Sequence, residues 1–191
     1  MRDLSALMSH LVQGYFRNTS LCRGGNDPAP GTPRSMVRGE GARHMTIRVR
    51  PFRELSTDEL YEIAQLRELV FHLEQRITVA DLDDLDRARD TRHWWVAGPA
   101  GIVAYARSVR LATPEHGAVA SFGRVAVRAA RRGEGLATGL VTAILEQFRD
   151  EPVVIHSQRD VVGLYERFGF RAVGEEFLEA GIPHRSMIRP V

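Results

Sequence analysis

The sequence contains no lysine, a single cysteine and no long apolar run. All 26 basic residues are arginine, so the lysine that a Walker A phosphate loop requires is missing. Cys22 alone cannot form an intrachain disulfide, and no Cys/His group has the spacing of a zinc site. No apolar stretch approaches the roughly 20 residues that span a bilayer. These absences exclude P-loop nucleotidases, and we expect a cytoplasmic protein with no membrane segment and no metal.

Charge is divided unevenly along the 191 residues. The first 50 residues carry eight arginines against three acidic residues, whereas the rest of the chain carries 18 against 21. The larger part of the chain is therefore mildly acidic. That balance argues against a nucleic-acid-binding surface and favours a cationic substrate.

Residues 1–44 do not have the pattern of a folded domain. Segment 17–44 is rich in Gly, Pro, Ser and Arg and has almost no apolar periodicity. Leu4–Phe16 predicts one amphipathic helix, and the arginine-rich, acid-poor composition also fits an organellar transit peptide. We interpret residues 1–44 as a disordered tail or an over-long annotated start, with the folded domain in residues 45–191.

From Met45 the apolar pattern becomes regular. Ser56 to Glu59 form a capping-box signature that opens a helix through Phe71, and residues 81–92 predict a polar loop. A hairpin turn is expected at Gly98–Gly101. The other predicted elements are strands at 46–50, 93–98, 102–111, 118–127, 152–157, 170–179 and 184–189, and helices at about 136–149 and 160–169. This order indicates an α/β protein with a mixed sheet of about seven strands.

A glycine-rich turn, Arg131–Leu140 (RRGEGLATGL), runs from a predicted strand into a predicted helix. Glycines let backbone N–H groups approach an anion, and a helix N-terminus adds positive potential, so the turn predicts a phosphate site. A dinucleotide-binding fold would place this turn after its first strand and an acidic residue at the end of the next strand. Here the next strand ends in His156 and Ser157 instead, which argues against a dinucleotide.

Arg132–Ala137 matches the Gln/Arg-x-x-Gly-x-Gly/Ala pattern of the GNAT N-acetyltransferase superfamily, and Leu164–Phe170 (LYERFGF) is similar to a later segment of that family. The chain also resembles the ElaA-like branch of the superfamily. The motifs that carry this resemblance are Leu66–Gln75, Asp81–Asp86, Arg92-His93, Tyr105–Arg107 and Gly181–Met187. It covers roughly residues 45–191 and implies the GNAT acyl-CoA N-acyltransferase fold, with flanking helices and acetyl-CoA as donor.

The resemblance implies how coenzyme A is held. Backbone N–H groups from Gly133 to Thr138 would donate to its pyrophosphate, and Arg132 would add a charge-assisted contact. Strand residues 125–127 would pair with the pantetheine amides where the sheet opens. Many members have glycine at Ala137 and asparagine at Gln158. The predicted cofactor-binding residues are Val125, Ala126, Val127, Arg132, Gly133, Glu134, Gly135, Leu136, Ala137, Thr138 and Gln158.

The catalytic residues follow partly from the resemblance. Tyr165 lies at the position whose phenol, in many GNAT enzymes, protonates the departing thiolate; otherwise it is a core tyrosine on an amphipathic helix. The candidates for the general base are Glu74, His93, His156 and His184, and a water chain with no dedicated base is the remaining alternative. We select Tyr165, Glu74 and His156 as the catalytic set, and expect His93 to be a structural hydrogen bonder.

The aspartates at 81, 83, 84 and 86 form the clearest acidic cluster. Such a cluster could attract a cationic amine, but a solvated loop with helix-capping aspartates is the preferred interpretation. The central glycine and terminal glutamate of an EF-hand are absent, which argues against a calcium loop.

Together these features predict an N-acetyltransferase that moves an acetyl group from acetyl-CoA directly to a primary amine of a small molecule or peptide. A backbone N–H of the opened strand would stabilise the tetrahedral intermediate. Three alternatives stay open: a protein N-terminus or lysine as acceptor, a longer acyl donor, and a non-catalytic acyl-CoA-binding module. We expect no nucleic-acid or membrane partner, and either a monomer or a homodimer.

Overall fold

Seven strands form one sheet within residues 45–191, the part of the chain that the computed structural model describes. The predictions made for residues 1–44 lie outside it. The sheet order is β1-β2-β3-β4-β5-β7-β6, and every neighbouring pair is antiparallel except β4 and β5. The strands are β1 (Ile47–Arg50), β2 (Arg92–Gly98), β3 (Gly101–Glu115), β4 (Ala118–Val127), β5 (Val153–Gln158), β6 (Arg171–Glu179) and β7 (Ile182–Arg189). The prediction of a mixed seven-stranded sheet is confirmed.

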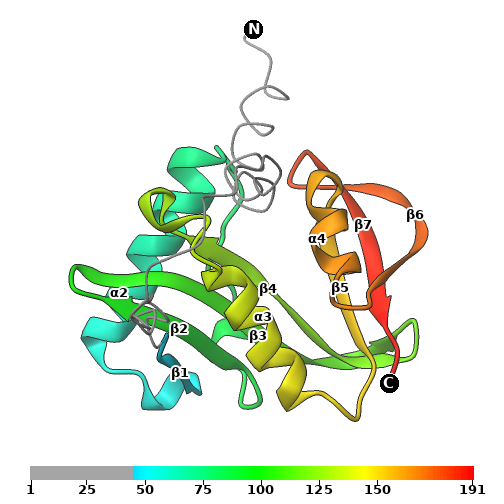
Figure 1. The fold of residues 1–191 in the computed structure, drawn as a ribbon, viewed down its shortest axis with the longest axis horizontal. Coiled ribbons are helices and arrows are strands. Elements are labelled where there is room, and N and C mark those ends of the chain that lie inside the picture. Colours follow the sequence, from blue (N-terminus) through cyan, green and yellow to red (C-terminus); the bar gives the residue numbers. More distant parts are fainter. Residues whose placement is uncertain (1–44) are drawn as a thin grey trace, which may run out of the picture.

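Helices cover both faces of this sheet (Figure 1). Helix α2 (Thr57–Arg67) begins at Ser56, whose hydroxyl accepts a hydrogen bond from the Glu59 amide while the Glu59 carboxylate accepts one from the Ser56 amide. This confirms the predicted capping box. The helix continues as a π-helical segment, Glu68–Glu74, longer than predicted.

The opposite face carries α3 (Leu136–Gln147) and α4 (Val162–Glu166), preceded by a 3-10 turn at Arg159–Val161. Helix α4 is therefore shorter than the predicted span of 160–169, although Gly169 does follow it with φ +84°. None of the helices in residues 45–191 is long and apolar enough to cross a membrane.

Two adjacent tryptophans show how β2 separates the two cores. Trp94 packs with Leu140 in the cluster under α3, whereas Trp95 is fully buried with Leu66 in the cluster under α2. Successive side chains of a strand point to opposite faces of the sheet, so the two tryptophans of β2 contribute one side chain to each core. The sheet is thereby fixed between two helical layers.

The sheet opens between β4 and β5. These strands pair at Ala120–Val153 and Ser121–Val154, close to the first residues of both strands, and then separate. Each keeps its antiparallel partner on the other side, β3 for β4 and β7 for β5. The edge Gly123–Val127 of β4 therefore faces β5 across an opening (Figure 1).

Arg124 lies in a bulge of β4 at this opening. Tyr105 of β3 pairs with Ala126 and Arg107 pairs with Gly123, so two β4 residues oppose one β3 residue. Arg124 has φ +55°, in the left-handed region that non-glycine residues rarely adopt. The bulge bends β4 just beyond its last pairing with β5, which is where the two strands diverge.

Candidate functional site

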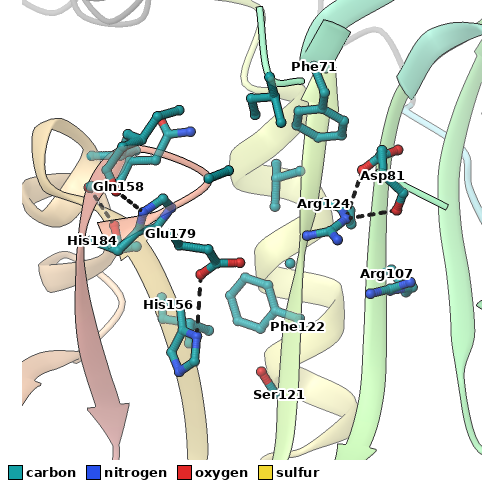
Figure 2. A pocket seen from close by; sticks show the side chains of 18 of the residues that line it. Phe71, Asp81, Arg107, Ser121, Phe122, Arg124, His156, Gln158, Glu179 and His184 are labelled. Carbon is teal, nitrogen blue, oxygen red and sulfur yellow. Dashed lines mark hydrogen bonds and ion pairs between the residues drawn. The ribbon is translucent and has the colours of Figure 1, made fainter. Parts of the chain in front are cut away.

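A cavity of about 520 Å³ fills the opening between β4 and β5, a size that suits a small-molecule site. The sequence predictions placed several residues at such a site, and the structure brings these together in the cavity wall. They are Val125, Val127, Arg132, His156, Gln158 and Tyr165, joined by the base candidate His184. Figure 2 shows part of this wall, with β5 and β7 on one side and β4 on the other.

The glycine-rich turn leads from the Arg132 end of the cavity into α3. Gly133 and Gly135 have φ values of +81° and +77°, which glycine adopts without strain, and Gly135 is the N-cap of α3. A Cβ added at Gly135 would meet nothing within 4 Å, so that side of the turn is open. The first N–H groups of a helix have no partner within it. The turn therefore fits an anion such as a pyrophosphate.

Side chains contribute little to this anion site. Leu136 and Ala137 are buried in the core under α3, so their side chains point away from any ligand. The Glu134 carboxylate accepts a hydrogen bond from Arg131 Nε at 2.7 Å. The predicted contacts of residues 133–138 are consequently main-chain contacts.

Two predicted site residues, Arg132 and Glu74, are paired with each other. The Arg132 guanidinium donates from Nη2 to the Glu74 carboxylate and from Nε to the Val127 carbonyl at 3.1 Å. The pair ties the glycine-rich turn to the end of the π-helical segment. Because the charge of Glu74 is already compensated by Arg132, this contact counts against Glu74 as the general base.

Gln158 spans the cavity from the end of β5. Its side-chain nitrogen donates to the Gln75 side-chain oxygen at 3.3 Å, and both residues are in the cavity wall. Sequence reasoning selected Gln158 and missed Gln75, although Gln75 ends the Leu66–Gln75 motif.

Tyr165 is held by aromatic neighbours on the side of the cavity that α4 covers. Its ring centroid lies 5.9 Å from that of Phe122 and 6.0 Å from that of Phe170. Tyr165 is partly buried against the core, yet it also lies in the cavity wall. The catalytic role of its phenol stays a prediction.

His156 lies on the other face of β5. Ile155 packs into the core under α3, so the alternation of the strand directs His156 to the opposite face. His156 Nδ1 lies 3.6 Å from a Glu179 carboxylate oxygen (Figure 2). On its other side, His156 Nε2 lies 2.8 Å from a carboxylate oxygen of Glu115. Hydrogen bonding to Glu179 and Glu115 raises the pKa of His156 to about 9, although partial burial opposes the shift.

The raised pKa keeps His156 protonated at neutral pH, which counts against it as a general base. Sequence reasoning missed its two carboxylate partners. Glu179 lies two residues before the Gly181–Met187 motif, and Glu115 precedes the tight turn at His116 and Gly117. The turn and the motif draw attention to these two glutamates in the sequence. Neither feature indicates that a histidine of β5 lies between them.

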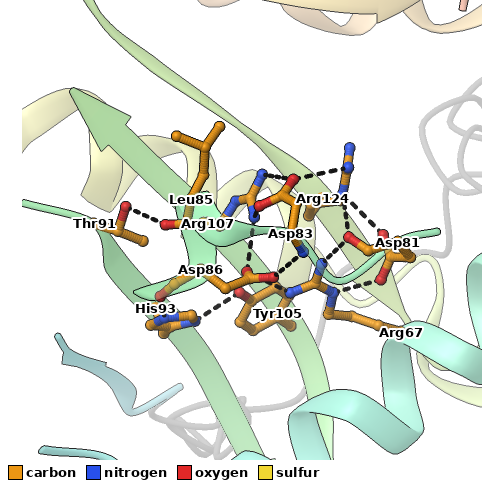
Figure 3. A network of polar contacts seen from close by, with 10 residues as sticks. All are labelled: Arg67, Asp81, Asp83, Leu85, Asp86, Thr91, His93, Tyr105, Arg107 and Arg124. Carbon is orange, nitrogen blue, oxygen red and sulfur yellow. Dashed lines mark hydrogen bonds and ion pairs between the residues drawn. The ribbon is translucent and has the colours of Figure 1, made fainter. Parts of the chain in front are cut away.

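Three aspartates of the acidic cluster form a largely buried ion-pair network (Figure 3). The expectation of helix-capping aspartates is confirmed, since Asp83 and Asp86 form a capping box at the 3-10 turn Asp84–Arg87. The expectation of a solvated loop is wrong for Asp81 and Asp86, whereas Asp83 is half-buried and Asp84 is exposed. The pairs are Arg67 Nε to Asp81 at 2.6 Å, Arg67 Nη1 to Asp86 at 2.7 Å, Arg107 Nη1 to Asp83 at 2.5 Å and to Asp86 at 2.8 Å, and Arg124 Nε to Asp81 at 2.8 Å. The network joins the loop to α2, β3 and the β4 bulge.

The network also sets protonation states. Burial alone would raise the pKa of Asp86, but hydrogen bonding to Arg67 and the charges of Arg67 and Arg107 outweigh it and lower that pKa. Burial alone would likewise raise the pKa of Asp83, and the Arg107 contact lowers it. Since these aspartates are ionised and matched by arginines, their charge is not free to attract an amine.

His93 is a structural hydrogen bonder, as expected. It is buried, and burial lowers its pKa. Its Nε2–H donates to the Asp86 carbonyl at 2.9 Å, and Nδ1 accepts from the Tyr105 hydroxyl at 2.8 Å. His184 differs: it lies in the cavity wall, and its Nδ1 donates to the Ile182 carbonyl at 2.8 Å.

Comparison with known proteins places these features in context. The profile of the acetyltransferase (GNAT) domain matches residues 86–189. Protein ElaA of Escherichia coli is 37% identical over 142 residues, which cover 72% of this chain and 92% of ElaA. A UPF0039 protein of Mycobacterium bovis is 36% identical over 140 residues, covering 72% of this chain and 88% of that protein.

Solved structures are similar over most of the described residues. The crystal structure of an acyl-CoA N-acyltransferase from Pseudomonas aeruginosa is 33% identical with a TM-score of 0.68, covering 76% of this chain and 99% of that one. The crystal structure of Escherichia coli ElaA gives the same TM-score of 0.68 at 34% identity, with the same coverage of 76% and 99%.

Proposed function

This chain belongs to the GNAT acetyltransferase family, and on that premise we propose that it transfers an acetyl group from acetyl-CoA directly to a primary amine of a small molecule or peptide. Family membership implies an acyl-CoA-dependent acyltransferase; the acetyl donor and the amine acceptor are our proposal. The observation that carries it is the cavity between β4 and β5. The β4 edge that β5 does not pair with and the charged side chains of Glu115, His156 and Glu179 line the same cavity.

The donor would be held mainly by main-chain groups. The N–H groups of residues 133–138 would bind the pyrophosphate at the N-terminus of α3. The β4 edge Gly123–Val127 would bind the pantetheine arm, because β5 does not pair with those residues. The Val127 carbonyl, which accepts from Arg132 Nε, is already paired. Bound acetyl-CoA supplies a thioester carbonyl as the electrophile.

Tyr165 would supply the proton that the leaving group needs. As the amine nitrogen bonds to the acyl carbon, the carbon–sulfur bond breaks and the phenol O–H donates to the thiolate. An ammonium ion gives up two protons in becoming an amide. One of them restores the phenol of Tyr165, and the other leaves to solvent.

The contacts of Glu74 and His156, the two base candidates selected from the sequence, favour transfer in which neither is the base. Glu74 is paired with Arg132, and His156 holds its proton between two carboxylates. We therefore propose that the amine loses its first proton through water at the open side of the cavity.

Thiol release by the purified full chain tests this function. The protein is mixed with acetyl-CoA and with monoamines, polyamines, amino acids or short peptides, and CoA binding is measured separately by calorimetry. We expect CoA binding and thiol release that depends on an added amine. Binding without amine-dependent release would identify an acyl-CoA-binding module instead, and absence of CoA binding would contradict the site itself.

A further inference from the structure

Two glutamates share one histidine on the face of the cavity away from α3 and α4. Glu115 comes from the end of β3 and Glu179 from the end of β6, while His156 lies between them on β5. Their side chains are 35%, 45% and 40% exposed, so a ligand in the cavity can reach all three. Two carboxylates and one imidazolium leave one negative charge uncompensated within this group.

The arginines that face the cavity are already matched by carboxylates. Arg124 is paired with Asp81 at 2.8 Å and Asp83 at 3.4 Å, and the almost fully buried Arg107 is paired with Asp83. Arg132, at the cofactor end, is paired with Glu74. With His184 of the same wall neutral, the one excess charge in the described wall is therefore negative and lies at Glu115 and Glu179.

The charges around Glu179 keep it ionised. Its hydrogen bond to His156 is the main cause of its lowered pKa, and the charges of His184 and Arg124 add to the effect although partial burial opposes it. An ionised carboxylate at the cavity wall accepts hydrogen bonds from an ammonium group strongly. The pair Glu115 and Glu179 can thus bind a cation without first losing a proton.

We infer that Glu115 and Glu179 bind the ammonium group of the acceptor, and that the acceptor is a primary amine with no carboxylate on the carbon next to nitrogen. This inference rests on the proposed function and narrows its substrate class. A free α-amino acid would place its own carboxylate against these glutamates, and the three arginines of the described cavity wall are already paired. Such like-charge contact weakens binding at an interface.

Matched amine pairs test the inference, because tyramine and tyrosine, or agmatine and arginine, differ by one carboxylate. With full-chain protein and acetyl-CoA, we expect kcat/KM to be at least about tenfold higher for the amine without the carboxylate. Glu115→Gln and Glu179→Gln should each raise KM for tyramine and reduce the preference for tyramine over tyrosine. Glu175→Gln, an exposed glutamate of β6 outside the cavity wall, is the matched control and should change neither.

A second readout separates this inference from the proposed function. Tyramine binding to the CoA-saturated protein is measured by calorimetry for the same variants. Binding that both glutamine substitutions weaken would support the subsite even without thiol release, whereas the missing release would contradict the acetyltransferase proposal. Equal or faster use of tyrosine, or tyramine binding unaffected by both substitutions, would overturn the inference and leave acetyl transfer intact.

Discussion

At the scale of single residues, Tyr165 is the side chain on which the proposed chemistry depends most. Its ring is held by Phe122 and Phe170, and these contacts do not involve the hydroxyl. Tyr165→Phe should therefore keep the fold while removing the proton donor. We expect kcat to fall about 100-fold or more, with KM for acetyl-CoA nearly unchanged. Steady-state kinetics and a melting curve measure both effects, and an unchanged kcat would show that Tyr165 is only a core residue.

Glu74 provides the complementary test at this scale. If Glu74 serves mainly to hold Arg132, Glu74→Gln should lower kcat by less than about tenfold, whereas loss of a general base costs about 100-fold or more. Glu68→Gln, on the exposed side of the same π-helical segment, is the control. A loss of about 100-fold in Glu74→Gln alone would restore Glu74 as the base.

Individual site residues were predictable where a local motif carried them. Tyr165 and Gln158 lie in recognisable segments near the late helix, and the structure places both in the cavity wall. The place of Glu115 and Glu179 in the cavity wall was not predictable. Each is the last residue of a strand, and the curvature of that strand and the turn that follows decide where the side chain points. No spacing along the chain encodes contacts between β3, β5 and β6.

At the scale of elements, the turn into α3 combines a left-handed backbone at Gly135 with the predicted anion site. Gly135 has φ +77°, and an alanine there costs roughly 1–2 kcal/mol in the left-handed region. Gly135→Ala should lower the free energy of unfolding by about 1 kcal/mol and weaken CoA binding, because the main-chain N–H groups must reorient. Chemical denaturation and calorimetry measure the two effects.

Gly117→Ala is the matched control for that prediction. Gly117 has φ +82° and, like Gly135, open space around an added Cβ, but it lies in the β3–β4 hairpin turn. It should lose similar stability and bind CoA normally. Equal CoA affinity in both variants would contradict the assignment of the turn.

Most elements followed from periodicity and turn chemistry. The capping box at Ser56, the hairpin around Gly98–Gly101 and the strand before the glycine turn are all present. The bulge at Arg124 and the π-helical segment after Arg67 had no local signal. Both depend on tertiary contacts, since Asp81 holds Arg124 and the core under α2 holds Val70.

At the scale of the whole molecule, the ion-pair network ties the loop after α2 to two strands of the sheet. Asp86 accepts from both Arg67 and Arg107, and these three side chains are almost fully buried. Asp86→Ala should cost about 3–5 kcal/mol, because two buried guanidinium groups each lose one of their two carboxylate partners. Urea denaturation measures the loss. The control Asp84→Ala, exposed in the same loop, should change stability by less than about 0.5 kcal/mol.

The dependence of stability on pH has a definite sign. The lowered pKa values of Asp83 and Asp86 contribute stability that is present above the ordinary aspartate pKa of 3.8 and lost as pH falls through their folded values. The pKa of His156, raised from 6.5 to about 9, contributes stability that is complete below 6.5 and lost as pH rises through 9. The lowered pKa of buried His93 acts in the opposite direction, because stability is lost as pH falls below 6.5 and the unfolded state takes up that proton. The free energy of unfolding should therefore be greatest near pH 6.5.

His156→Gln should flatten the alkaline side of that profile. It should also reduce the part of the acid side that comes from the lowered pKa of Glu179, because that shift depends mainly on His156. Denaturant titrations at a series of pH values measure both limbs. If the free energy of unfolding of the variant still falls with rising pH on the alkaline side, the imidazolium between Glu115 and Glu179 is not the cause of that fall.

The overall architecture was predictable because the strand and helix patterns and the family motifs agree over the same residues. The charge distribution inside the fold was not. The sequence shows four aspartates in one loop, and nothing local indicates that Arg67, Arg107 and Arg124 converge on three of them from α2, β3 and β4. Such convergence is a property of the folded chain.

The account depends most on a donor and an acceptor meeting in the opening between β4 and β5. A crystal structure of the full chain with CoA joined through an acetyl bridge to tyramine tests this directly. We expect the pyrophosphate on the N–H groups of residues 133–138, the pantetheine along Gly123–Val127 and the tyramine part on the side of Glu115 and Glu179. A ligand whose CoA part avoids the turn, or whose tyramine part lies outside the opening, would contradict the account.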